Sequence, residues 1–189
     1  MIDRKSLLSL AAAVLGAVVL GVLVKDALRE PQTIRALPKA PAAAAPRPVS
    51  LPGGATLDLA APPERLLIVH FWATWCAPCV EEFPGLLKFW KEFGSRPGLD
   101  LLAVSVDGDW KTVEGWIAKV GAGGVPLALD PEKKTASAFG TDKFPETYVL
   151  SPSGRVLEKF VGAVDWSSPS VRNRIEQLRQ ASTTNLTGG

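Results

Sequence analysis

The 189-residue sequence is poor in residues that bind metals or form disulfides, with two cysteines, one histidine and one methionine. Two cysteines are too few for a disulfide-rich scaffold, and with the histidine they fall short of a closed tetrahedral zinc site. The chain also lacks a strong net charge, since the formal value is +2, and it has no lysine–arginine cluster. We therefore expect no metal site and no nucleic-acid partner.

The remaining composition is that of a globular protein, with 47% hydrophobic and 21% charged residues. The length allows one compact domain with additional segments. We predict five regions: a cytoplasmic tail at 1–6, a membrane anchor at 7–24, a linker at 25–48 rich in proline and alanine, a domain at 49–180, and a disordered polar tail at 181–189.

The anchor is predicted from the apolar run Leu7–Val24, which follows Arg4 and Lys5. As a helix this run is roughly 27 Å long, enough to cross a bilayer core. A cleavable signal peptide is the alternative, but its apolar region is usually shorter. Basic residues flank both ends, so charge does not decide the orientation. The layout of a signal anchor predicts a single-pass protein of the inner membrane with its domain in the periplasm.

Strands and helices are expected to alternate in the domain. The apolar pattern predicts strands over Val49–Leu51, Thr56–Leu59, Leu66–Trp72, Leu99–Val106, Val125–Leu129, Glu146–Leu150 and Val156–Val161. It predicts helices over Cys76–Phe93, Trp110–Val120, Glu132–Phe139 and from Ser168 onward, with a kink at Pro84. The first two strands form a hairpin. This order indicates an α/β fold with a mixed central sheet flanked by helices.

The two cysteines stand two residues apart, in Cys76-Ala77-Pro78-Cys79, directly after Trp75 and the apolar strand. A Cys-x-x-Cys motif between a strand and a helix is typical of thiol–disulfide exchange. The amides at the start of a helix favour a thiolate, which is the species that attacks a disulfide. A copper-binding pair or a structural disulfide are the alternatives, although a loop this short adds little stability.

The chain resembles the TlpA-like branch of the thioredoxin superfamily, which consists of membrane-anchored extracytoplasmic thiol–disulfide oxidoreductases. The resemblance rests on the segments Phe71–Cys79, Glu82 with Pro84, Val104–Asp107, Phe144–Val149 and Ser151–Gly154. It implies a thioredoxin fold with a TlpA-like βα insertion and an N-terminal hairpin. It also implies client proteins with disulfides or cysteines, a membrane-embedded electron donor, and no cofactor beyond the redox-active disulfide. Proteins of this branch commonly serve cytochrome c maturation or assembly of the copper site of cytochrome oxidase.

The resemblance assigns roles to the site residues. Cys76 is the nucleophile and Cys79 resolves the mixed disulfide. Pro145 is expected to be cis and to lie against the cysteines, so that the backbone of Phe144 faces a client peptide. Trp75, with Ala77 and Pro78, is expected to shape the rim of the site.

Two further residues are candidates for moving protons. Glu82 lies one helical turn after Cys79, and the resemblance places a glutamate here in the active site. His70, the only histidine, is a candidate proton acceptor or a third copper ligand. A core histidine bonded to the backbone is the more ordinary interpretation.

We predict a protein-disulfide reductase. The alternatives are a Cu(I) chaperone using Cys76 and Cys79, a thiol peroxidase, and a membrane-tethered adaptor without activity. The peroxidase is disfavoured because no arginine stands near Cys76 in the sequence.

Overall fold

The protein is described by a computed structural model that covers residues 47–60 and 64–187. All of these residues belong to the second of the two units of the chain, Ile34–Gly189. The predicted regions 1–6 and 7–24, and nearly all of the linker at 25–48, lie outside the described residues. Within the described part of the chain, no helix has the length and apolar character needed to cross a membrane.

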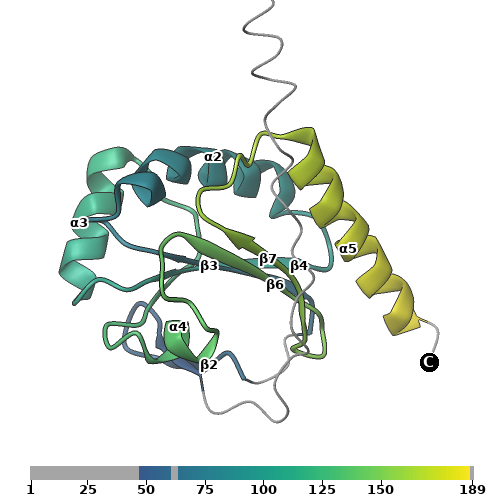
Figure 1. Cartoon of the computed structure of the whole chain (residues 1–189), viewed down its shortest axis with the longest axis horizontal. Coiled ribbons are helices and arrows are strands. Elements are labelled where there is room, and N and C mark those ends of the chain that lie inside the picture. The colour runs from purple at the N-terminus through teal and green to yellow at the C-terminus, as the bar shows by residue number, and fades with distance from the viewer. Residues whose placement is uncertain (1–46, 61–63, 188–189) are drawn as a thin grey trace, which may run out of the picture. The chain divides into compact units, whose positions relative to one another are not determined.

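The centre of the fold is a seven-stranded mixed sheet with the order β2-β1-β5-β4-β3-β6-β7 (Figure 1). The strands are β1 (Pro48–Ser50), β2 (Thr56–Asp58), β3 (Leu66–Trp72), β4 (Leu99–Ser105), β5 (Leu127–Leu129), β6 (Glu146–Leu150) and β7 (Val156–Val161). β4 is parallel to β3 and β5, whereas β6 is antiparallel to β3 and β7. β1 and β2 form the predicted antiparallel hairpin.

Helices cover both faces of this sheet. They are α2 (Ala77–Phe93), α3 (Trp110–Val120), α4 (Lys134–Ala138) and α5 (Pro169–Thr187). Figure 1 shows α2, α3 and α5 on one face and α4 on the other. Because both faces are covered, all seven residues of β3 are buried, which explains why its sequence is apolar without alternation. The predicted mixed α/β sheet is confirmed.

The helix α2 follows directly from the cysteine motif and packs on the central strands. The ring of Phe83 in α2 packs against the rings of Trp72 and Trp116, at centroid distances of 4.5 and 5.1 Å. The helix continues through Pro84. Its buried positions include Cys79 and Glu82, whereas the apolar Leu87 and Trp90 are only partly buried. The buried face of α2 therefore includes Cys79 and Glu82.

The ends of two helices follow from local structure. In α3, Val120 is exposed because the helix ends there at Gly121, whose φ of 65° is left-handed. The last helix was expected to end near residue 180, but α5 continues to Thr187. Ser182 is buried, and its hydroxyl donates to the carbonyl of Leu178 within the same helix.

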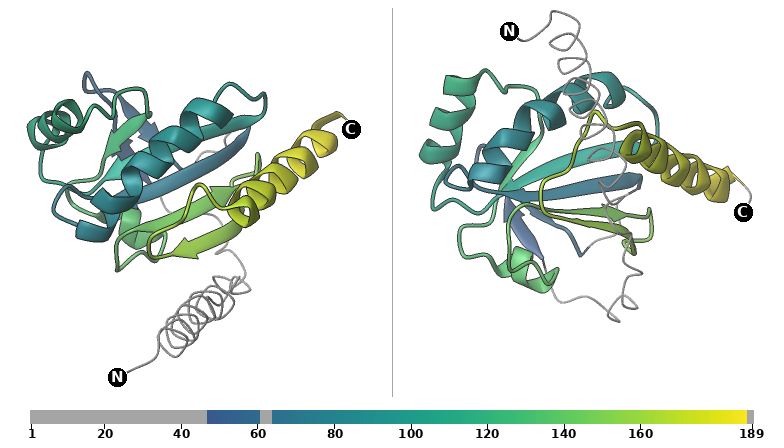
Figure 2. Two further views of the ribbon diagram at one scale, coloured as in Figure 1. Left: turned by 90° about the horizontal axis from the view of Figure 1, so that it is seen from above. Right: turned by 45° about the horizontal axis from the view of Figure 1, so that its top comes forward.

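The helices α2 and α5 lie side by side on the same face, as both views of Figure 2 show. Two ion pairs connect them near the end of α2: Arg172 with Glu92 at 2.7 Å, and Arg96 with Glu176 at 3.0 Å. The segment between β7 and α5 passes close to α2 and carries Trp166, whose ring packs on Phe89 at 5.1 Å. This packing brings residues before α5 next to the active-site helix.

Candidate active site

The two cysteines form a disulfide at the start of α2, with an S–S distance of 2.06 Å and a Cα–Cα distance of 5.2 Å. Cys76 is the residue that caps the helix, and the backbone N–H of Cys79 donates to its sulfur at 3.4 Å. Cys76 keeps 7% of its surface exposed and Cys79 none. The structure therefore places one sulfur at the surface and the other behind it, the arrangement that the order of attack and resolution requires.

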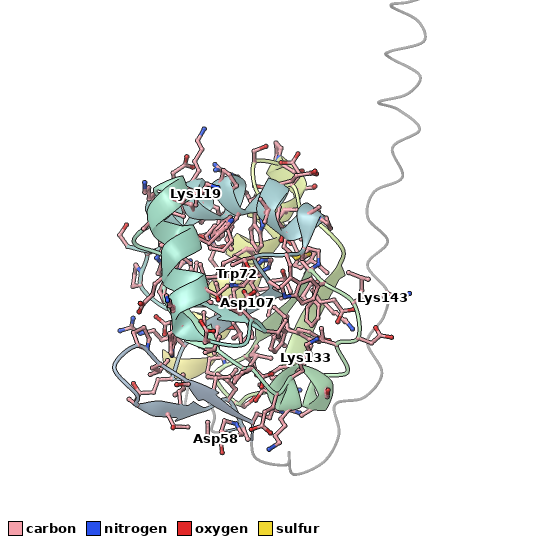
Figure 3. All side chains as sticks on the ribbon, turned by 90° about the vertical axis from the view of Figure 1, so that its left-hand side faces the viewer. Asp58, Trp72, Asp107, Lys119, Lys133 and Lys143 are labelled. Carbon is pink, nitrogen blue, oxygen red and sulfur yellow. A yellow bond between two sulfur atoms is a disulfide. The ribbon has the colours of Figure 1, made fainter. Side chains whose placement is uncertain are left out.

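The loop before Cys76 is held by a buried carboxylate at the end of the neighbouring strand. Asp107 accepts hydrogen bonds from the backbone N–H of Thr74 at 3.0 Å and from the Thr74 hydroxyl at 2.8 Å. The Ser105 hydroxyl donates to the same carboxylate at 2.6 Å. Figure 3 shows Asp107 near Trp72, where β3 and β4 end. The sequence analysis gave Asp107 no role, although an acid directly after a buried strand is a recognisable signal.

On the opposite side of β3, the bond between Phe144 and Pro145 is cis, as expected. Pro145 is buried, and its carbonyl accepts a hydrogen bond from the N–H of Gly162 at 2.9 Å. The ring of Phe144 meets the ring of Trp75 edge-on at 6.1 Å. Since Trp75 adjoins Cys76, this contact brings the cis-proline loop to the cysteine motif.

Hydrogen bonds also fix the start of β6, which directly follows Pro145. The hydroxyl of Tyr148 lies 2.9 Å from the carbonyl of Phe139, 2.9 Å from the Thr141 hydroxyl and 3.0 Å from the Glu146 carboxylate. The ammonium of Lys159 lies 2.9 Å from the same carboxylate. A satisfied buried network of this kind fixes the position of the loop.

Exposed side chains surround the cysteines. Trp75 is 61% exposed, Ala77 and Pro78 are exposed, and Phe144 is partly buried. The structure thus brings together all the residues predicted for the rim. It adds Lys133, which the sequence analysis missed, with its ammonium 5.3 Å from the centre of the Trp75 ring.

Glu82 and His70 form a buried pair beneath this surface. The His70 Nε2 atom lies 3.1 Å from Glu82 Oε1, and within the described residues neither atom has a hydrogen bond to any other group. The second ring nitrogen, Nδ1, is 2.9 Å from the hydroxyl of Thr147. The other oxygen of Glu82 accepts a hydrogen bond from the backbone N–H of Val164. His70 therefore contacts two side chains and not the backbone, which corrects the ordinary interpretation.

Burial keeps both members of this pair uncharged. It raises the pKa of Glu82 to about 8, although the hydrogen bond from Val164 acts in the opposite direction. It lowers the pKa of His70 to about 3. At neutral pH the carboxyl group of Glu82 then keeps its proton beside Nε2, and the neutral imidazole of His70 carries one proton.

The geometry does not favour the predicted copper alternative. The nitrogens of His70 face Glu82 and Thr147, so neither is left for an ion at the cysteines. In the described part of the chain, no three His, Cys, Asp or Glu side chains are grouped so as to hold a metal. Glu82 follows Cys79 by one turn of α2, where side chains are neighbours.

The architecture belongs to the thioredoxin-like class. A solved structure titled as a putative thioredoxin from Neisseria meningitidis has a TM-score of 0.62 at 22% identity, and the match covers 74% of this chain and 91% of that one. The model of the AhpC/TSA family matches residues 38–159, and the chain belongs to that family.

Two curated relatives carry names that state an activity. The chain is 30% identical over 98 residues to "Thiol-disulfide oxidoreductase ResA" of Bacillus subtilis (strain 168), and the matched stretch covers 52% of this chain and 54% of that protein. It is 31% identical over 98 residues to "Thiol:disulfide interchange protein HelX" of Rhodobacter capsulatus, covering 52% and 53%. The chain thus spans about half the length of the curated relatives it matches. The predicted resemblance to thiol–disulfide oxidoreductases is confirmed.

Proposed function

We propose that the protein reduces disulfides in client proteins by thiol–disulfide exchange. The observation that carries the proposal is the Cys76–Cys79 disulfide at the first turn of α2, next to the exposed Trp75, whose ring meets that of Phe144 at 6.1 Å. The printed names of the two relatives support the same activity.

The first step uses the reduced protein. The thiolate of Cys76 attacks one sulfur of the client disulfide, so that a bond between Cys76 and the client forms and the client's S–S bond breaks. The second client sulfur leaves as a thiolate and takes a proton from water. A position at a helix N-terminus lowers the pKa of a cysteine, which favours Cys76 as the attacking group.

The second step regenerates the disulfide. Cys79 loses its proton and attacks the Cys76 sulfur. The client sulfur bound to Cys76 leaves as a thiolate and takes a proton from water, and the protein is left oxidised by two electrons. The proton of Cys79 passes to the carboxylate of Glu82, one turn further along α2. The raised pKa of Glu82 in the oxidised protein supports this assignment, because the carboxyl group retains the proton it has received.

His70 acts in this step by holding Glu82. Its Nε2 atom lies 3.1 Å from Glu82 Oε1, and the Thr147 hydroxyl lies 2.9 Å from Nδ1 on the other side of the ring. The imidazole is held between these two side chains and fixes the position of the Glu82 carboxyl group. His70 is thus the positioning residue and Glu82 the proton acceptor.

The setting of the reaction is part of the proposal. The apolar run Leu7–Val24 supports a single membrane anchor with the domain on the periplasmic side. We also infer that α3 and the short β5, which pairs with β4, form the insertion expected for the TlpA-like branch. The client is then a protein matured at the membrane surface, in cytochrome c maturation or in assembly of the copper site of cytochrome oxidase. A membrane-embedded donor returns the electrons.

The test measures turnover of a protein disulfide. The reduced protein is mixed with an excess of oxidised insulin and a regenerating reductant, and the release of insulin thiols is followed. We expect turnover by the native protein, none by Cys76→Ser and less than one turnover by Cys79→Ser. Equilibration with glutathione gives the reduction potential of the cysteine pair, which shows whether the protein oxidises or reduces its clients. A potential near about −120 mV is that of an oxidant, and one near about −270 mV is that of a reductant. Rapid consumption of hydrogen peroxide without insulin reduction would contradict the proposal.

A further inference from the structure

An exposed surface of unusual composition lies next to the cysteine motif. It consists of Trp75, Phe144 and Lys133, and we call it the aromatic–lysine surface. Trp75 is 61% exposed although large aromatic side chains are generally well buried. Its ring and that of Phe144 are 6.1 Å apart, in an edge-on arrangement that leaves ring surface open to a partner.

The cation of Lys133 lies over both rings. Its Nζ atom is 5.3 Å from the centre of the Trp75 ring and 6.0 Å from that of Phe144, within the range of cation–π attraction. Figure 3 shows Lys133 beside the start of α4. The two rings hold the ammonium group above the site without neutralising its charge.

The backbone also directs Lys133 to this place. It has a φ of 55°, and of the non-glycine residues in the described ranges it alone has a positive φ. The left-handed conformation is unfavourable for a residue with a side chain, and here Asp130 holds the turn. The Asp130 carbonyl accepts from the Lys133 N–H at 3.0 Å, and the Asp130 carboxylate accepts from the N–H of Ala136 at 2.8 Å.

The charge of Lys133 is available to a partner. Within residues 47–60 and 64–187, no ion pair of Lys133 with a carboxylate is present, whereas its neighbour Lys134 lies 2.5 Å from Glu132. Ala77 and Pro78, between the cysteines, carry no charge. Exposed Asp142 and Lys143, which precede Phe144, have opposite charges and offset each other.

We propose that the aromatic–lysine surface selects client segments that carry an aspartate or glutamate beside the reacting cysteine. This inference rests on the proposed disulfide exchange and adds a preference among its substrates. An extended client segment that approaches Cys76 passes Trp75 and Phe144, and its acidic side chain then reaches Lys133. Because the rings already hold the ammonium group in place, little side-chain freedom is lost on binding.

The test compares three peptides that differ only beside their single cysteine, which has Glu, Gln or Lys as its neighbour. Each cysteine is activated as a mixed disulfide with thionitrobenzoate. Attack by the Cys76 thiolate on the peptide sulfur releases thionitrobenzoate, and its absorbance gives the rate constant. Each rate is divided by the rate of the same peptide with dithiothreitol, which removes the intrinsic reactivity of the disulfide.

We expect the full-length reduced protein to prefer the Glu peptide over the Lys peptide by roughly three- to tenfold, because one surface charge pair is replaced by a repulsion. The preference should shrink in about 1 M salt. Lys133→Met should bring the ratio close to one, and Lys133→Arg should retain it. Lys134→Met is the matched control, since it removes a neighbouring exposed lysine that is already paired, and it should keep the native ratio.

An unchanged ratio in Lys133→Met, or an equal loss in Lys134→Met, would overturn the inference while the exchange reaction itself continued. A native protein that reacts with none of the three peptides would instead remove the proposed function. The two failures are therefore distinguishable in one experiment.

Discussion

The stability of the oxidised protein should fall as the pH rises above neutrality, because Glu82 must give up its proton inside the fold. Burial raises the pKa of Glu82 to about 8, whereas the same carboxyl group has a pKa of 4.5 in the absence of the fold. Between these values the folded protein binds one proton more than the unfolded chain. The free energy of unfolding therefore decreases with pH over this interval.

His70 limits the interval in which the decrease is visible. Burial lowers its pKa from 6.5 to about 3, so between those values the unfolded chain binds the extra proton and stability rises with pH. The two effects oppose each other from about pH 4.5 to 6.5. Above pH 6.5 only Glu82 contributes, and one proton changes the free energy of unfolding by about 1.4 kcal/mol per pH unit. Over roughly 1.5 units up to pH 8 the expected loss is about 2 kcal/mol.

Urea denaturation of the oxidised protein from pH 6 to pH 9 would measure this loss. The interval suits the experiment because the disulfide removes both thiols from the titration and His70 is the only histidine. Glu82→Gln should show a free energy of unfolding that is nearly constant with pH. Glu81→Gln is the matched control, since Glu81 is the adjacent exposed carboxylate on the same helix, and it should retain the native slope.

The reasoning is refuted if Glu82→Gln loses stability with pH as steeply as the native protein. It is refuted equally if Glu81→Gln removes the slope. The α-amino group titrates in the same range, but it is identical in all three proteins and cancels from the comparison.

Three substitutions test the framework of the site. Asp107→Ala removes the acceptor of both Thr74 hydrogen bonds and should lower the free energy of unfolding in urea by at least about 2 kcal/mol; a loss below about 0.5 kcal/mol would show that the loop is held otherwise. Tyr148→Phe leaves the Phe139 carbonyl without its donor and should cost about 1–2 kcal/mol in the same assay, with no loss if water replaces the hydroxyl. Gly98→Ala should lower the melting temperature, because φ is 81° and a Cβ would lie 2.8 Å from the Thr183 methyl group; an unchanged value would mean that α5 moves aside.

The sequence predicts those parts of the site whose residues lie in one continuous segment of the chain. The cysteines, Trp75 and the helix after them follow from a strand pattern, a Cys-x-x-Cys motif and a proline in the first turn. β3 was predicted with its observed bounds because a run of six apolar residues and His70, without alternation, is typical of a strand covered on both faces.

The sequence does not predict contacts between distant segments. Thr74 and Asp107 are 33 residues apart, and only the parallel pairing of β3 with β4 brings them together. His70 meets Glu82 because Glu82 lies on the buried face of α2. The hydrogen bond from Val164 to Glu82 depends on a segment 82 residues further along the chain. The sequence does not single out Lys133, because nothing in a charged loop indicates which lysine has a left-handed backbone.

The central claim is that Cys76 exchanges disulfides with client proteins, and trapping tests it most directly. Cys79→Ser leaves the mixed disulfide unresolved, so extracts of cells that produce this variant should contain the protein joined through Cys76 to client cysteines, identifiable by mass spectrometry after non-reducing separation. Adducts that are absent from Cys76→Ser but abundant in Cys79→Ser are the predicted result. Equal adducts in both variants, or no adducts in Cys79→Ser, would contradict the account.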